Sequence, residues 1–147
     1  MHGIGAAHRT THLEAVHMAV VRAFIVDDNP TLRANLAGTL RDVARVEPVG
    51  EADSEASGSA WLREHAGQWD LAIVDLFIGD GSGLRVLEAC RTRAPGQRVV
   101  VLSNHTTHQV RVRCRQLGAD AVFDKATELE DLIDFCLRSR EARLQAH

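Results

Sequence analysis

The chain has 147 residues, of which 45% are hydrophobic and 25% are charged, and its formal net charge is -3. A chain of this length is typical of one domain that buries roughly two-thirds of its unfolded surface, so it needs no disulfide or structural metal to fold. The mixed charge, without a basic stripe, excludes an obvious nucleic-acid-binding surface and favours protein partners.

The first 19 residues differ from the rest in composition. They are rich in His, Gly, Ala and Thr, and their histidines are His2, His8, His12 and His17. We interpret residues 1–19 as a flexible extension and residues 20–147 as the domain proper. A metal-binding arm is the alternative, but the irregular histidine spacing without Cys or acidic co-ligands argues against it. We find neither a membrane-length apolar run nor a signal peptide, so we expect a cytoplasmic protein without membrane contact.

Short apolar runs alternate with amphipathic segments from Val20 onward. The runs cover residues 20–26, 46–49, 71–74, 99–102 and 121–123. Runs that are short, continuous and rich in β-branched residues are typical of strands buried on both faces of a parallel sheet. Pro48 interrupts the second run, which indicates a strand at the edge of the sheet.

Segments with helical periodicity follow each predicted strand. After the start signal Asn29-Pro30, an apolar stripe is formed by Leu32, Leu36 and Leu40. Further helices are predicted near residues 54–67, 82–94 and 107–117, and a last helix from Thr127, which has capping-box spacing to Glu130. Five successive βα units predict an α/β fold, a doubly wound parallel sheet. The flavodoxin-like strand order 2-1-3-4-5 is the leading candidate.

The three cysteines are Cys90, Cys114 and Cys136, which are far apart and form no CxxC pair. We interpret them as reduced, small apolar residues on helices, because an odd number of scattered cysteines does not suit a disulfide framework or a metal site.

Polar residues stand where the predicted strands end. Asp27 and Asp28 follow the first strand, Asp75 the third, Ser103 the fourth and Lys125 the fifth. The carboxyl ends of parallel strands meet at one edge of a sheet, so we expect these side chains to converge there. Three crowded carboxylates repel one another, and oxygen ligands favour Mg²⁺ as the resident cation.

Phosphoryl transfer is the chemistry that this set of residues favours. Asp75 is the candidate nucleophile, since its strand is central in the predicted sheet. Lys125, the only lysine of the chain, would neutralise a phosphoryl oxygen, and Ser103 would donate a hydrogen bond to the transferred group. Phe77 would offer its backbone carbonyl to the metal.

The same residues resemble the receiver domains of bacterial response regulators, of the stand-alone, single-domain type. The matching motifs are Val-Asp-Asp-Asn at 26–29, Val-Asp-Leu at 74–76 with Asp-Gly-Ser-Gly at 80–83, Val-Leu-Ser at 101–103, and Gly-Ala-Asp at 118–120 leading to Asp-Lys at 124–125. The resemblance covers about residues 20 to 140.

The resemblance implies a role for each site residue. Asp75 would be the phosphoacceptor, and Asp28 would bind Mg²⁺ directly and Asp27 mainly through water. The phosphate-binding and switch set is Ser103, Asn104 and Lys125, with Ser103 as the switch hydroxyl.

The resemblance also implies a two-component phosphorelay, in which a sensor histidine kinase or a histidine phosphotransfer protein is the partner. The chain would catalyse only its own phosphorylation and dephosphorylation. We expect no output domain, so the fourth helix, fifth strand and fifth helix would act on a separate downstream protein. A phosphate-shuttle role and a homodimer remain open alternatives.

Some positions depart from the family pattern. Gly79 and Ala126 stand where proline is common. Val122 stands where an aromatic switch residue is frequent, and Phe123, its neighbour, should face the opposite side of the strand. Coupling would then rest on the switch hydroxyl and on backbone movement.

Three residues near the expected phosphoacceptor suggest a long-lived phosphoryl group. Phe77, Asn104 and His105 are expected to crowd the path of water to an acyl phosphate. This crowding predicts slow self-dephosphorylation.

Three alternative functions compete with the switch. An aspartate-nucleophile phosphatase needs a second carboxylate two residues after the nucleophile, where this chain has Phe77. A receiver-like scaffold without phosphorylation would not need the intact polar set. A nucleotide-binding protein of flavodoxin type would need a glycine-rich loop after the first strand.

Overall fold

The computed structural model describes residues 20–145, and the predicted extension with its histidines lies outside this range. A parallel sheet of five strands, in the order β2-β1-β3-β6-β7, forms its centre. The strands are β1 (Val21–Val26), β2 (Val46–Ala52), β3 (Leu71–Val74), β6 (Arg98–Ser103) and β7 (Ala121–Asp124). Counted among these five strands, the order is 2-1-3-4-5, so the predicted flavodoxin-like sheet is confirmed.

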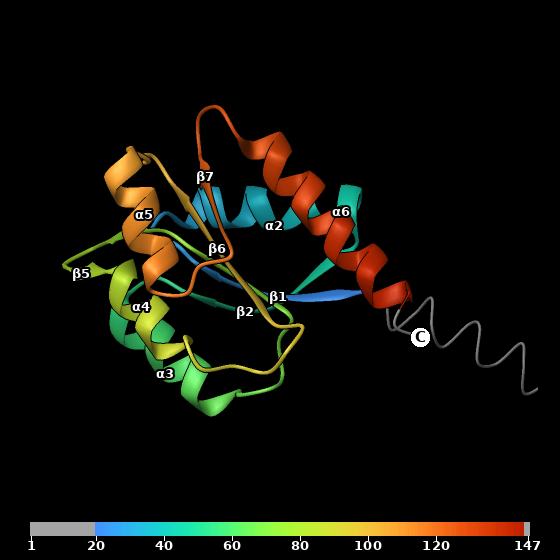
Figure 1. Cartoon of the computed structure of the whole chain (residues 1–147), viewed down its shortest axis with the longest axis horizontal. Coiled ribbons are helices and arrows are strands. Elements are labelled where there is room, and N and C mark those ends of the chain that lie inside the picture. The colour runs from blue at the N-terminus through green and yellow to red at the C-terminus, as the bar shows by residue number, and fades with distance from the viewer. Residues whose placement is uncertain (1–19, 146–147) are drawn as a thin grey trace, which may run out of the picture.

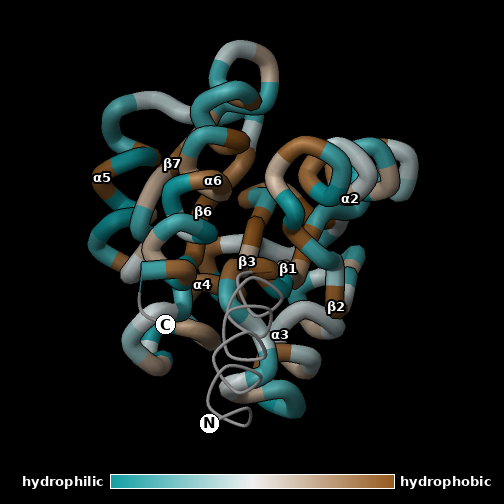
Figure 2. The backbone as a smooth tube through the Cα atoms, turned by 90° about the vertical axis from the view of Figure 1, so that its right-hand side faces the viewer, coloured by the Kyte–Doolittle hydropathy of each residue, from teal (hydrophilic) through white to brown (hydrophobic). Residues whose placement is uncertain are grey.

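Helices cover both faces of the sheet (Figure 1). One face is covered by α2 (Pro30–Ala44) and α6 (Leu129–Gln145). The other face is covered by α3 (Glu55–Glu64), α4 (Gly83–Ala89) and α5 (His108–Gln116). Figure 2 shows the strands as the hydrophobic centre between these two layers. Within residues 20–145, no helix is both long enough and apolar enough to cross a bilayer.

Alternate residues of each strand point to opposite layers of the core. In β1, Phe24 packs toward α3 and α4, whereas Ile25 packs toward α2 and α6. In β7, Val122 and Phe123 divide in the same way, and the Phe123 ring packs edge-on against Phe135 of α6 at a centroid distance of 5.9 Å. Phe123 therefore faces the side opposite to Val122, as predicted.

The edge strand and the helix starts follow from local chemistry. Beside Pro48, the pairing of β1 with β2 shifts register between Ala23 and Phe24, because proline has no N–H for the ladder. The Asn29 side chain caps α2 by accepting a hydrogen bond from the N–H of Leu32.

The start predicted for the last helix is wrong, because α6 begins at Leu129 and not at Thr127. Asp124 Oδ1 accepts hydrogen bonds from the N–H groups of Ala126 and Thr127 and holds them in a turn before the helix.

The segment after β3 folds as a small antiparallel hairpin. Its strands are β4 (Phe77–Ile78) and β5 (Gly81–Ser82). Gly79 in its turn has φ 59°, a conformation that is closed to proline. Glycine adopts this conformation without strain, whereas proline could not form the turn.

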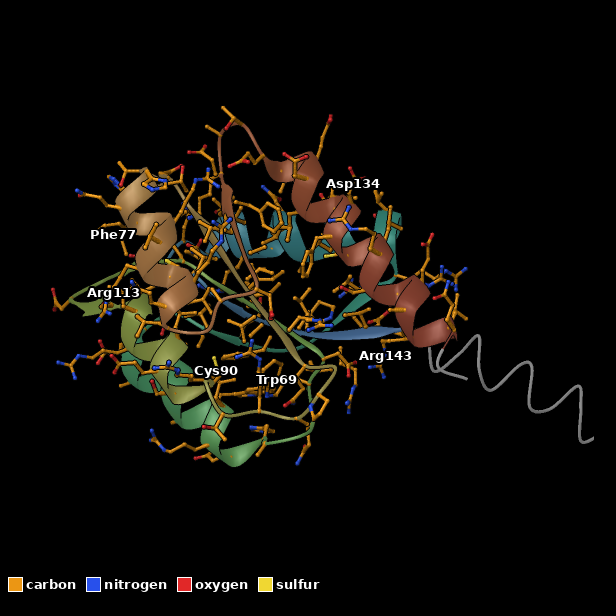
Figure 3. All side chains as sticks on the ribbon, viewed as in Figure 1. Trp69, Phe77, Cys90, Arg113, Asp134 and Arg143 are labelled. Atoms are coloured by element: carbon orange, nitrogen blue, oxygen red, sulfur yellow. The ribbon has the colours of Figure 1, made fainter. Side chains whose placement is uncertain are left out.

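The three cysteines are free and buried, and Cys114 and Cys136 lie on helices as predicted, whereas Cys90 is the C-cap residue that follows α4. Figure 3 labels Cys90, which packs in the core layer of α3, α4 and α5. Burial raises the pKa of Cys90 to about 11 and that of Cys136 to about 12, so both thiols stay protonated and inert near neutral pH.

Gly83, the first residue of α4, lies close against the backbone that follows β3. A Cβ atom there would lie 2.1 Å from the carbonyl oxygen of Asp75 and 2.7 Å from Cα of Leu76. We therefore expect Gly83→Ala to lower the free energy of unfolding by about 3 kcal/mol, because backbone atoms would have to move apart. Urea unfolding measures this change.

Gly38→Ala is the matched control. Gly38 lies inside α2, and a Cβ atom added there would meet nothing within 4 Å. We expect this substitution to raise stability by roughly 0.5–1 kcal/mol, since alanine favours helix. Equal effects of the two substitutions would contradict the close approach at Gly83.

Candidate functional site

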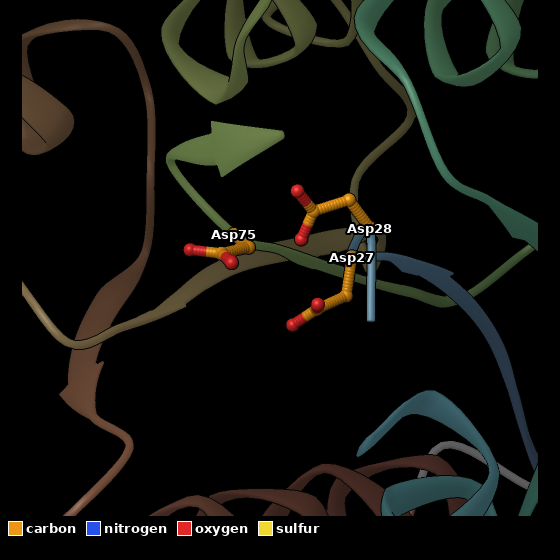
Figure 4. Close-up of side chains that lie close together, drawn as sticks. All are labelled: Asp27, Asp28 and Asp75. Carbon is orange, nitrogen blue, oxygen red and sulfur yellow. The ribbon is translucent and has the colours of Figure 1, made fainter. Parts of the chain in front are cut away.

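Three acidic side chains meet at the carboxyl edge of the sheet. Asp27 and Asp28 directly follow β1, and Asp75 directly follows β3, its neighbour in the sheet. One carboxylate oxygen from each of the three lies within 4.8 Å of the others (Figure 4). Asp27 and Asp75 are buried, whereas Asp28 is exposed.

Lys125 completes this pocket from the end of β7. Its Nζ donates hydrogen bonds to Asp27 Oδ2 at 2.7 Å and to Asp75 Oδ2 at 2.9 Å. Burial alone would lower the pKa of Lys125, but these two carboxylates raise it overall, so the ammonium stays charged. One ammonium faces three carboxylates, and the pocket keeps an excess of negative charge.

Burial raises the pKa of Asp75, and the hydrogen bond and charge of Lys125 offset this only in part. The ionised Asp75 carboxylate is therefore short of neutralising partners. Asp70, the buried acid at the opposite edge of the sheet, differs because it forms ion pairs with Arg22 and Arg143. Negative charge without a neutralising partner therefore lies at the carboxyl edge of the sheet.

Backbone N–H groups orient the three carboxylates. Asp27 Oδ1 accepts from the N–H of Asn29 at 2.9 Å, and Asp75 Oδ1 accepts from the N–H of Phe77 at 3.4 Å. Asp28 Oδ2 accepts from the N–H of Gly79 at 3.0 Å, a bond that a proline there could not donate. Sequence reasoning missed these donors, because every residue except proline carries an N–H.

Ser103, the last residue of β6, is fully buried beside the pocket. Its Oγ accepts a hydrogen bond from the N–H of His105 at 3.1 Å, and its carbonyl accepts from the N–H of Lys125 at 2.9 Å. The second bond joins the end of β6 to Lys125, the residue that contacts both buried acids.

Phe77 and His105 form an aromatic pair next to the acids. Phe77 is 57% exposed, and its ring lies 4.5 Å from the His105 ring, measured between centroids. Asn104 is exposed in the same loop as His105. The three residues expected to crowd the path of water therefore lie in the two segments that follow Asp75 and Ser103.

The donor set fits a hard divalent cation. Its ligand atoms are carboxylate oxygens from three side chains, without sulfur or imidazole, and this chemistry suits Mg²⁺ or Ca²⁺. The cation would also balance the negative charge that Lys125 leaves. Asp27, Asp28 and Asp75 are the side chains that would hold it.

Comparison with known proteins places this arrangement in a family. The family model for the response regulator receiver domain matches residues 23–136. The DNA-binding transcriptional activator DevR/DosR of Mycobacterium tuberculosis is 30% identical over 100 residues, which cover 68% of this chain and 45% of that protein. The acid tolerance regulatory protein ActR of Sinorhizobium medicae is 34% identical over 109 residues, which cover 74% of this chain and 54% of that protein.

The solved structures agree with this assignment. The signal receiver domain of NarL from Mycobacterium tuberculosis matches with a TM-score of 0.70 and 26% identity, covering 82% of this chain and 96% of that one. The chain spans about half the length of the two curated relatives it matches. The match over residues 23–136, the sheet order and the solved neighbours agree, and this chain belongs to the response regulator receiver domain family of two-component signalling.

Proposed function

We propose that Asp75 is a phosphoacceptor and that its phosphorylation switches the binding of a protein partner. The observation that carries the proposal is the bridge of Lys125 between Asp27 and Asp75, in a pocket where three carboxylates lie within 4.8 Å. Receiver domains interact with histidine kinases or phosphotransfer proteins, and one of these would donate the phosphoryl group.

The proposed transfer uses the charges of the pocket. An oxygen of the Asp75 carboxylate attacks phosphorus, the bond from phosphorus to the donor breaks, and the donor atom keeps the electron pair. Lys125 would then move from the carboxylates to a phosphoryl oxygen, and the Ser103 hydroxyl, whose Oγ already accepts a hydrogen bond from the N–H of His105, would donate a hydrogen bond to another phosphoryl oxygen. Bound Mg²⁺ would reduce the repulsion between the carboxylate and the phosphoryl oxygens. Phe77 would offer its backbone carbonyl to the cation.

Several further assignments belong to this proposal. The receiver unit would extend over residues 20–147, slightly beyond the family match, and would act in the cytoplasm. It would catalyse only its own phosphorylation and dephosphorylation. Asn104 would lie over the phosphoryl group, and the surface of α5, β7 and α6 would bind the downstream partner.

Mass spectrometry of the intact chain tests the proposal. After incubation with Mg²⁺ and a small acyl phosphate, we expect the mass to rise by one phosphoryl group. A chelator in place of Mg²⁺ should prevent the increase. An unchanged mass in Mg²⁺, with a known receiver domain phosphorylated in parallel, would reject the proposal.

The Phe77–His105 pair predicts a long-lived phosphoryl group. We expect Phe77→Ala and Asn104→Ala each to shorten the phosphoryl lifetime by about tenfold, because either change opens a path for water to the acyl phosphate. Intact mass followed over time after removal of the donor gives the lifetime.

Val43→Ala is the control for Phe77→Ala. Val43 is 56% exposed, about as much as Phe77, and lies in α2. Its substitution should leave the lifetime unchanged. If the phosphoryl lifetime of the unmodified chain is short, and neither Phe77→Ala nor Asn104→Ala alters it, the shielding role is rejected.

A further inference from the structure

One arginine of α5 joins three separate segments beside the pocket. Arg111 Nε donates to the carbonyl of Thr106 at 3.0 Å, and its Nη1 donates to the carbonyl of Val122 at 2.9 Å. Its Nη2 forms an ion pair with Glu128, just before α6. The loop after β6, strand β7 and the segment before α6 are thus held by a single planar group.

A second set of hydrogen bonds closes the same junction. Thr106 Oγ1 donates to Asp124 Oδ2 at 2.8 Å, and the N–H of Asp124 donates to Glu128 Oε1 at 3.1 Å. Hydrogen bonds, first of all from Thr106, lower the pKa of Asp124, and the hydrogen bond from Arg111 lowers that of Glu128. Both acids are therefore charged at neutral pH, and the bonds to them are charge-assisted.

Both ends of this junction lie close in sequence to residues of the phosphoacceptor pocket. Thr106 lies three residues after Ser103, in the loop whose start carries the proposed switch hydroxyl. Asp124 directly precedes Lys125, which contacts Asp27 and Asp75. A change in the partners of Ser103 or Lys125 therefore acts on the two loops that Arg111 connects.

We propose that Arg111, with Glu128, Thr106 and Asp124, is a latch that carries the state of Asp75 from the pocket to α5 and the first turn of α6. The inference rests on the proposed phosphorylation of Asp75. Val122, in the middle of β7, is buried in the core layer of α3, α4 and α5, so it offers no side chain that could turn between pocket and surface. The polar latch provides a direct bonded route between the same two places.

Hydrogen–deuterium exchange tests the latch. Mg²⁺ and an acyl phosphate should change the exchange of residues 103–107 and of residues 128–133, which include Glu128 and the first turn of α6, together in the unmodified chain. In Arg111→Gln, the chain should still take up one phosphoryl group, and the change at 103–107 should remain, but the change at 128–133 should be lost. Thr106→Val, which removes the bond to Asp124 and keeps the side-chain shape, should weaken the change at 128–133 and decides the test if Arg111→Gln does not fold.

Arg113→Gln is the matched control. Arg113 lies on the same helix, two residues further on, and is exposed (Figure 3). Its substitution should leave both changes in exchange intact. A full response at 128–133 in a folded, phosphorylated Arg111→Gln chain, or in Thr106→Val if Arg111→Gln is unfolded, would overturn the latch and leave the phosphoacceptor intact. An unmodified chain that gains no phosphoryl group would overturn both.

Discussion

Asp75→Asn is expected to abolish phosphoryl uptake from an acyl phosphate without unfolding the domain. An amide oxygen is too weak a nucleophile to attack phosphorus, but it can still accept the 2.9 Å hydrogen bond from Lys125 Nζ. The amide NH2 then takes the place of Oδ1, and only the long 3.4 Å bond from the N–H of Phe77 is lost. Burial raises the pKa of Asp75, so the charged carboxylate destabilises the folded state at neutral pH. The neutral amide should therefore leave the unfolding temperature unchanged or raise it.

Asp80→Asn is the control for this substitution. Asp80 is an exposed acid in the hairpin turn after β4, five residues from Asp75. Asp80→Asn should leave phosphoryl uptake intact. It removes one negative charge, as Asp75→Asn does, but outside the pocket. Persistent uptake of a phosphoryl group by a folded Asp75→Asn chain would show that another residue accepts it.

Lys125→Met should have two large effects. The Lys125, Asp27 and Asp75 side chains are only 11%, 4% and 8% exposed, so the change leaves two buried carboxylates without their cation. Loss of one partner of such a pair should lower the free energy of unfolding by about 3 kcal/mol. Loss of a fixed charge at the phosphoryl oxygens should slow uptake by about 100- to 1,000-fold.

Mg²⁺ should restore part of the stability that Lys125→Met loses, because a cation bound only by the folded acids stabilises the folded state. Urea unfolding with and without Mg²⁺ measures this recovery. Arg41→Met is the control, since the ion pair of Arg41 with Glu47 is about half exposed and should contribute less than about 1 kcal/mol. A Lys125→Met chain as stable as the unmodified chain in a chelator would contradict the account of the pocket charge.

The fold was predictable because its signals are repeated and regular. Four of the five apolar runs end at polar residues, and each run is followed by a helical stripe such as Leu32, Leu36 and Leu40, so the βα alternation leaves few topologies. The hairpin of β4 and β5 was missed, since two-residue strands carry no periodicity. The first residue of α6 was also missed, because the turn held by Asp124 competes with the start of the helix at Thr127.

The residues of the pocket were predictable from position alone. Residues that end parallel strands share one edge, and the structure brings Asp27, Asp28, Asp75 and Lys125 together there. The supporting contacts were not predictable, because they use backbone groups. Arg111 contacts two backbone carbonyls, and Asp28 is oriented by the N–H of Gly79. The type of a residue does not reveal which of its backbone groups will form such contacts.

Locating the phosphoryl group on the chain tests the central claim most directly. The phosphorylated protein, prepared with Mg²⁺ and an acyl phosphate, would be digested under acyl-phosphate-preserving conditions and mapped by tandem mass spectrometry. We predict one phosphoryl group, on Asp75. A phosphoryl group on any other residue, or none while a known receiver domain is phosphorylated in parallel, would contradict the account.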